Sequence, residues 1–211
     1  MRFEQRRKSF FTQMAELDSL RTQADYDTGS VSAATCWAIY SVANYFAPQE
    51  IVEVGTFIGR TALSMAQGTE DAGVIAEIHT CDASNGMELP QPLKCSLIQY
   101  PRQTSTSMLE KMRSDKHDWQ IELIHLDGRL QDRDVDSLKL MSALNVVLAL
   151  DDFEGIEKGA LNYSSIRASG WLKSSVLIYP PERRVLERFG LQGTCTTALL
   201  VPSSLIALTN Q

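Results

Sequence analysis

The amino-acid sequence predicts an α/β fold with one doubly wound sheet, mostly parallel, and helices on both faces. Short apolar runs of strand length alternate with helix-like segments over the first three quarters of the chain. The run 51–54 is apolar apart from Glu53, which is typical of a parallel strand covered on both faces. Two last runs, 197–201 and 205–208, flank a Pro-Ser-Ser turn and predict antiparallel strands at the C-terminal end. Such a sheet is Rossmann-like.

The length and net charge of the chain indicate a single-core protein and argue against some classes of partner. A chain of 211 residues suits one α/β core. The net charge of −6 and a pI near 5.1 argue against a nucleic-acid partner bound through a basic surface. No apolar run approaches the ~20 residues of a membrane span, and no apolar segment of a secretory signal follows the basic N-terminus. We therefore expect a cytoplasmic protein with no membrane partner.

The cysteines support the same compartment. They are scattered without a CxxC pair, so we expect buried free thiols in a reducing cytoplasm rather than disulfides or a zinc site. The four are Cys36, Cys81, Cys95 and Cys195.

The N-terminal part predicts two helices. Residues 1–27 have apolar side chains at roughly helical spacing, and 32–46 predict a second helix that Pro48 ends. The buried stripe of the second helix is predicted to be Cys36, Ile39, Tyr40, Ala43 and Phe46. We predict that 1–46 form N-terminal helices and 47–211 the main domain. The first helix either packs on this domain or serves as a lid or dimer arm, so a homodimer through these helices is possible.

The remaining elements alternate. We predict strands at 51–54, 74–81, 97–100, 120–126, 146–150 and 175–179, and helices at 61–66, 104–113, 156–165 and 181–189. A further helix follows the strand at 120–126, with its inner face at Val135, Leu138 and Met141. Its charged residues are predicted to form a solvated face, and these are Asp132, Arg133, Asp134 and Asp136.

The stretch 51–66 predicts a strand, a tight turn and a helix that together bind a ligand. Its pattern is acidic-x-Gly-x-x-x-Gly, from Glu53 through Gly55 to Gly59. Glycine permits positive φ and a close approach of the backbone to a ligand. The free amides at the start of the following helix could hold an anionic group. Glu53 itself, at the end of a buried strand, needs a partner.

Acidic residues end three further predicted strands. Asp82, Asp127 and the pair Asp151-Asp152 each follow an apolar run. Ligands of doubly wound sheets bind outside the carboxyl ends of the strands. The repetition therefore predicts a binding site along this edge.

These residues resemble class I S-adenosylmethionine-dependent methyltransferases, and among them the small-molecule O-methyltransferases of the catechol-type and sugar-modifying branches. The segment Glu53-Val-Gly-Thr-Phe-Ile-Gly-Arg-Thr is similar to their first motif, E-x-G-x-x-x-G-x-S/T. The likeness runs from about Gly29 to Glu157. It implies that S-adenosylmethionine is held by Glu53, Gly55, Thr56, Gly59, Thr61, Asp82, Ser105 and Asp127.

The resemblance also implies roles within this set. The loop from Gly55 to Gly59 would approach the methionine portion of the cofactor, and Thr61 would hold its carboxylate. Asp82 would accept the ribose hydroxyls. Ser105 would contact the adenine edge, although it also suits a helix cap, and both interpretations stay open.

A magnesium site is a further implication of the resemblance, at Asp127, Asp151 and Asp152. Three carboxylates suit Mg²⁺, which could lower the pKa of a substrate hydroxyl and orient its oxygen. The alternative is that Asp127 only borders the cofactor while the other two cap a helix. In the metal-dependent branches an aspartate or lysine base follows the first metal aspartate by two or three residues, where this chain has Arg129 and Leu130. Neither can act as a base, so Asp127 is the remaining candidate for catalysis.

Three functions are consistent with these patterns. The leading hypothesis is methylation of a hydroxyl group on a small-molecule acceptor. The second is a non-catalytic relative that works as an interaction module. The third, a nicotinamide-dependent oxidoreductase, is disfavoured because Thr56 followed by Phe57 breaks the G-x-G-x-x-G fingerprint. No histidine has a ligand-like partner at motif spacing, so packing or surface roles are expected for His79, His117 and His125.

Overall fold

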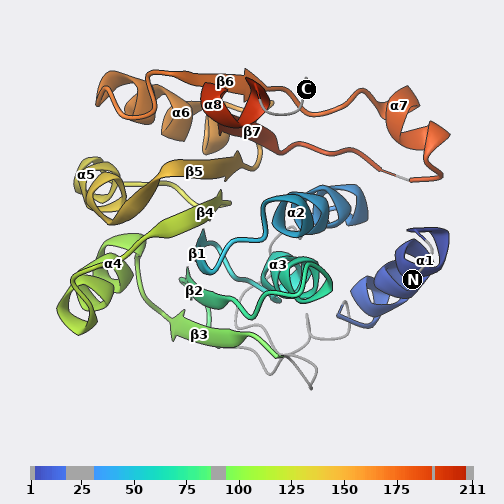
Figure 1. The fold of residues 1–211 in the computed structure, drawn as a ribbon, viewed down its shortest axis with the longest axis horizontal. Helices are drawn as coiled ribbons and strands as arrows, with labels where there is room; N and C mark the ends of the chain where they lie inside the picture. Colours follow the sequence, from blue (N-terminus) through green and yellow to red (C-terminus); the bar gives the residue numbers. More distant parts are fainter. Residues whose placement is uncertain (1–2, 18–30, 87–93, 192, 208–211) are drawn as a thin grey trace.

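The computed structural model describes residues 3–17, 31–86, 94–191 and 193–207. Within these residues seven strands form one sheet in the order β3-β2-β1-β4-β5-β7-β6 (Figure 1). The strands are β1 Glu50–Val54, β2 Glu77–Asp82, β3 Ser96–Pro101, β4 Ile121–Leu126, β5 Ser142–Leu150, β6 Ser175–Ile178 and β7 Ala198–Pro202. The first five are parallel, and β7 is antiparallel to both of its neighbours. The predicted sheet is confirmed.

Helices cover both faces of the sheet, as Figure 1 shows. On one face lie α2 (Ala33–Phe46) and α3 (Arg60–Asp71), and on the other α4 (Ser105–Asp115), α5 (Asp132–Met141) and α6 (Gly159–Ala168). The helix α1 (Phe3–Leu17) lies outside this layer, while α7 (Arg183–Arg188) and α8 (Ser203–Ala207) belong to the C-terminal part.

Each face of the sheet has its own apolar core, because successive side chains of a strand point to opposite faces. In β1, Val52 packs with Met108 and Leu138 of the layer that contains α4 and α5. Its neighbour Ile51 packs with Met65 in the layer of α2 and α3. Both strand faces are therefore buried, which explains why these runs are almost continuously apolar.

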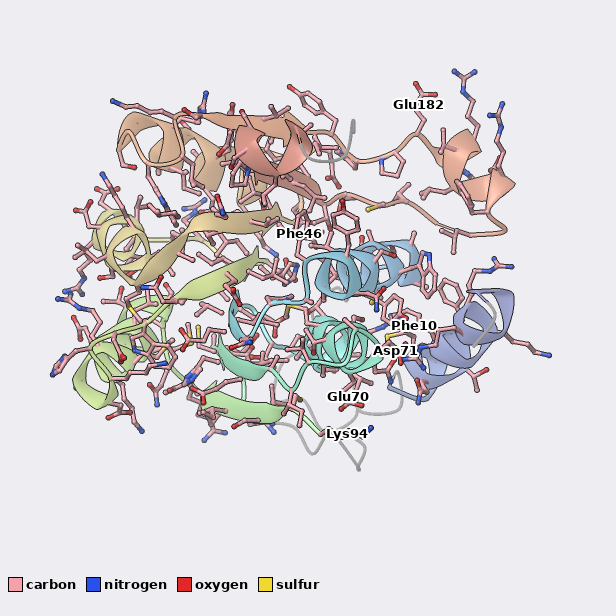
Figure 2. The ribbon with its side chains drawn as sticks, viewed as in Figure 1. Phe10, Phe46, Glu70, Asp71, Lys94 and Glu182 are labelled. Carbon is pink, nitrogen blue, oxygen red and sulfur yellow. The ribbon has the colours of Figure 1, made fainter. Side chains whose placement is uncertain are left out.

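The N-terminal helix packs on the domain through aromatic side chains. The buried Phe10 places its ring centroid 5.3 Å from that of Trp37 and 5.2 Å from that of Tyr40 (Figure 2 labels Phe10). Ile39 and Ala43, on the predicted stripe of α2, share a core cluster with the strands. This geometry agrees with a helix packed on the domain. The boundary at residue 46 and a dimer through these helices stay predictions.

Most predicted elements are present, with shifted ends. The predicted helix over 1–27 is observed as α1, and residues 18–30 lie outside the described part. The predicted strand 74–81 begins only at Glu77, and the predicted helix 156–165 begins at Gly159, after a series of turns. All four cysteines are buried and free, as predicted. No helix in the described ranges is both long and apolar enough to cross a membrane.

The predicted strand at 205–208 is wrong. Residues 203–207 form α8, and residue 208 lies outside the described ranges. The amide of Ser203, directly after Pro202, donates a 2.8 Å hydrogen bond to the carbonyl of Ser174. Leu205 and Ile206 then pack against the same core as α2 and α3. Tertiary packing thus overrides the strand-like composition of this short run.

Candidate functional site

The carboxyl ends of the parallel strands meet at one edge of the sheet. Val54 at the end of β1 pairs with Cys81 of β2 and with Leu126 of β4, and Leu126 pairs with Leu150 of β5. The residues that follow these strands therefore lie side by side. The acidic residues that end or follow these strands thus share one edge of the sheet, and a binding site there stays a prediction.

A cavity of about 510 Å³ opens along this edge. Four of the predicted site residues line it, namely Gly55, Asp82, Ser105 and Asp127. Its other lining residues are Val54, Cys81, Ala83, Arg102, Gln103, Thr104, Gly128, Arg129, Gln131 and Lys158. Glu53, Thr56, Gly59 and Thr61 are not among them, so only half of the predicted cofactor contacts reach the cavity wall.

Glu53 connects the elements beneath the cavity. The hydroxyl of Thr61 at the start of α3 donates to Oε1 of Glu53, and the hydroxyl of Thr80 in β2 donates to Oε2 at 2.6 Å. Nδ1 of His125 in β4 lies 3.2 Å from Oε1. The buried carboxylate thus has the partners it needs, and it ties β1, β2, β4 and α3 together. The Thr61 hydroxyl is engaged with Glu53, and the contact with the cofactor carboxylate that the resemblance implies stays a prediction.

His125 shares the buried environment of Glu53. Burial by itself lowers the pKa of the imidazole, but the Glu53 carboxylate outweighs this, helped by Asp151 and Asp127, and the net pKa is raised. The structural role expected for His125 agrees with this position inside β4.

The glycine loop is held against its neighbours by backbone contacts. Gly55 has a φ of 104°, and a Cβ there would lie 3.1 Å from the carbonyl carbon of Asp127. A side chain would therefore be strained and crowded at this point. Two residues on, Phe57 also has a positive φ, of 42°. Its amide donates a 2.8 Å hydrogen bond to Oδ2 of Asp82.

Asp82 lines the cavity and is only 8% exposed. Its Oδ1 accepts a second backbone amide, from Ser84 at 2.7 Å. Asp82 thus holds the loop that follows β1, and its carboxylate lies on the wall of the cavity.

The start of α4 decides one of the two interpretations of Ser105, the helix cap. The helix cap is Thr104, whose hydroxyl accepts from the amide of Ser107 at 3.2 Å. Ser105 instead donates to Oδ2 of Asp134 at 2.7 Å, and Thr106 donates to Oδ1 at 2.6 Å. The cap assignment is therefore wrong for Ser105. An adenine contact stays a prediction, supported only by the position of Ser105 on the cavity wall.

Asp134 was predicted on a solvated face, and this is wrong. Its side chain is 1% exposed and accepts the amide of Gln131 at 2.9 Å in addition to the two hydroxyls of α4. Gln131 and Asp134 form a capping box at the start of α5, which turns Asp134 inward. The spacing Gln-x-x-Asp before an apolar run was the available signal. Asp132, Arg133 and Asp136 are exposed as predicted.

The three candidate metal ligands do not converge. Nζ of Lys158 lies 3.0 Å from Oδ1 of Asp127 and 3.0 Å from Oδ2 of Asp152. The third carboxylate, Asp151, is turned away and accepts the hydroxyls of Thr196, at 3.2 Å, and Thr197. No group of three His, Cys, Asp or Glu in the described part of the chain could hold a metal ion. As arranged, these residues do not fit the magnesium site that the resemblance implies.

Arg129 and Leu130 stand where the metal-dependent branches have a base, and both side chains contact other parts of the protein. Arg129 lines the cavity and donates from Nε and Nη2 to the carbonyl of Glu157, at 3.2 and 3.1 Å. Leu130 packs against the core. Lys158 is not among the predicted site residues, because it lies inside the helix predicted at 156–165. The Lys-Gly pair six residues after the acidic pair was the only signal in the sequence.

Comparisons with known proteins give a likeness in fold. No protein-family model and no curated protein sequence matches the chain. The O-methyltransferase of Bacillus cereus in complex with SAH superposes with a TM-score of 0.60 at 11% identity, covering 90% of each chain. The O-methyltransferase TomG of Streptomyces achromogenes, involved in tomaymycin synthesis and in complex with SAM, gives 0.59 at 13% identity, covering 90% of this chain and 89% of TomG. The chain has the fold of class I methyltransferases.

A third structure extends the likeness to a fungal protein. The SAH-bound methyltransferase PaMTH1 of Podospora anserina matches with a TM-score of 0.53 at 12% identity, covering 90% of this chain and 87% of PaMTH1. The methyltransferase fold also differs from a nicotinamide-binding sheet, which has the strand order 3-2-1-4-5-6. Here the antiparallel β7 lies between β5 and β6. The sheet order thus adds to the sequence argument against an oxidoreductase.

Proposed function

We propose that this protein is an S-adenosylmethionine-dependent methyltransferase that acts on a hydroxyl group of a small molecule. The observation that carries the proposal is the cavity at the carboxyl ends of β1, β2 and β4, which Gly55, Asp82 and Asp127 line together. The fold shared with O-methyltransferases that were solved with SAM or SAH supports it.

The cavity wall suggests how the cofactor is held. The backbone at Gly55 suits close approach by the methionine portion, since no side chain intervenes. Asp82 suits the two ribose hydroxyls because its carboxylate lies on the cavity wall at the carboxyl end of β2. The adenine would lie toward the N-terminus of α4, where Arg102 to Ser105 line the cavity. Glu53 and Thr61 act from beneath, by fixing the loop and the start of α3.

The reaction that follows from this arrangement is a direct transfer. The acceptor oxygen forms a bond to the methyl carbon as the bond between carbon and sulfur breaks, and S-adenosylhomocysteine leaves. The hydroxyl proton passes to a base, for which we propose the Asp127 carboxylate, because it lies on the cavity wall directly after β4. Arg129 on the same wall suits an anionic group on the acceptor. We keep the cytoplasm as the proposed location.

Calorimetry with S-adenosylhomocysteine tests the proposal. We expect the wild type to bind it with micromolar affinity, about 8 kcal/mol of binding free energy. Asp82→Ala should weaken binding, whereas Asp118→Ala, an exposed residue outside the cavity lining, should leave it unchanged. Absence of binding by a folded wild type would overturn the proposal.

A second candidate function is a cofactor-binding relative without catalysis. The observation that favours it is the pair Arg129 and Leu130, neither of which can accept a proton. The two functions differ in turnover. Transfer of a radiolabelled methyl group to any member of a panel of small hydroxyl compounds supports the enzyme, whereas tight binding with no transfer to any of them supports the non-catalytic protein.

A further inference from the structure

A lysine ammonium lies between two of the carboxylates that the resemblance assigns to a metal ion. Lys158 contributes to the wall of the cavity, and its Nζ lies at hydrogen-bond distance, 3.0 Å, from both Asp127 and Asp152. Its side chain is 38% exposed, so the charge faces the cavity region without being fully hydrated. These are the bonds that the ammonium makes in the described residues.

The backbone is shaped to bring Lys158 to this place. Gly159 follows it at the start of α6, and a Cβ there would lie 2.4 Å from the carbonyl oxygen of Asp151 and 2.9 Å from the Cα of Phe153. Only glycine lets the chain pass so close to the end of β5. Asp152 has a φ of 50°, a left-handed conformation that an aspartate tolerates better than most residues. The close approach at Gly159 and the positive φ of Asp152 belong to the turn that brings the side chains of Asp152 and Lys158 together.

The charges at this place resemble those of a metal site, with the Lys158 ammonium in the position of the cation between two carboxylates. Two carboxylates in contact with one ammonium leave one net negative charge, and Lys158 is the cation that both contact among the described residues. The separation of 3.0 Å between Nζ of Lys158 and each carboxylate is that of an ion pair with a hydrogen bond. The ammonium has three donors, and the carboxylates engage two of them.

We propose that Lys158 takes the place of a divalent cation in this site, so that methyl transfer proceeds without a metal. The ammonium neutralises and positions Asp127 and Asp152, and its third N–H donates to the acceptor oxygen. This inference rests on the proposed function for the acceptor, but the exclusion of a metal by Lys158 stands on the geometry alone. A protonated amine is a fixed point charge, which suits this role.

Binding of Mn²⁺, followed by the loss of the free-ion signal in electron paramagnetic resonance, tests the proposal. The wild type should bind no Mn²⁺, and its affinity for S-adenosylhomocysteine should be the same with Mg²⁺ and with a chelator. Lys158→Ala should gain Mn²⁺ affinity by at least about tenfold, because Asp127 and Asp152 are then free to bind a cation. Lys158→Arg keeps a cation and should not gain it, and Lys158→Ala combined with Asp152→Ala should lose it again.

Several results would overturn the inference. Specific Mn²⁺ binding by the wild type would do so even if Lys158→Ala failed to fold. A folded Lys158→Ala protein, shown by a cooperative thermal transition, that gained no Mn²⁺ affinity would do so too. Failure of the proposed function has a different signature, which is the absence of S-adenosylhomocysteine binding by the wild type whatever the metal content.

Discussion

The amide of Phe57 donates a 2.8 Å hydrogen bond to Oδ2 of Asp82, so the carboxylate at the end of β2 holds the turn that follows β1. Phe57 adopts a φ of 42°, which costs a bulky residue free energy and therefore needs such a restraint. The residue proposed to bind ribose is thus also the residue that shapes the glycine loop.

The first prediction separates these two roles of Asp82. Asp82→Ala should weaken S-adenosylhomocysteine binding by at least about tenfold, since a buried amide acceptor and the ribose acceptor are lost together. Asp82→Asn keeps one oxygen and should lose less. Calorimetry measures both affinities, and equal affinity in the wild type and Asp82→Ala would contradict the assignment.

The second prediction concerns Asp134. Asp134→Ala should lower the free energy of unfolding by about 3 kcal/mol, because Ser105, Thr106 and the amide of Gln131 lose their shared acceptor in a buried place. Asp136→Ala is the matched control on the same helix, where the side chain is exposed, and should change stability by less than about 0.5 kcal/mol. Urea denaturation compares them, and equal effects would show that the network contributes nothing.

The third prediction is a pH dependence of stability from His125. Its pKa in the folded protein is raised above the ordinary value of 6.5, so the ion pair with Glu53 stabilises the fold fully below pH 6.5. That contribution is lost as the pH rises from 6.5 through the raised pKa, because in this window the folded state binds more protons than the unfolded state. The stability difference between the wild type and His125→Gln should therefore shrink toward high pH. Denaturant midpoints over this range test it, and a difference that grew with pH would have the wrong sign.

The fourth prediction concerns the contact between α2 and α3. A Cβ on Gly68 would lie 2.5 Å from the carbonyl oxygen of Tyr40 and 2.8 Å from the Cβ of Ala43, so the two helices would have to separate. Gly68→Ala should lower the free energy of unfolding by about 2 kcal/mol, despite the better helix propensity of alanine. Gly155→Ala, whose Cβ would meet nothing closer than 3.8 Å, is the control. A thermal midpoint for Gly68→Ala at or above that of the wild type would refute the close packing.

The carboxyl-edge site was predictable because it depends on local sequence and one topological rule. Gly55, Asp82 and Asp127 each follow an apolar run, and the ends of parallel strands meet at one edge. The contacts of two polar residues near the site have a different origin. The hydroxyls of Thr61 and Ser105 donate to buried carboxylates of other elements. The residues next to them in the sequence do not indicate that Glu53 and Asp134 are their partners.

The sequence by itself determined the local elements, which are the alternating apolar runs, the glycine turn and the acidic strand ends. Periodicity and turn chemistry are properties of neighbouring residues, so they can be read from the sequence. Only the tertiary structure decided which carboxylates face the cavity, which are buried, and that Lys158 meets Asp127 across 31 residues. Such pairings depend on how separate elements pack. The sequence shows that a carboxylate such as Asp127 follows a strand, but the packing of separate elements determines that Lys158 lies beside it.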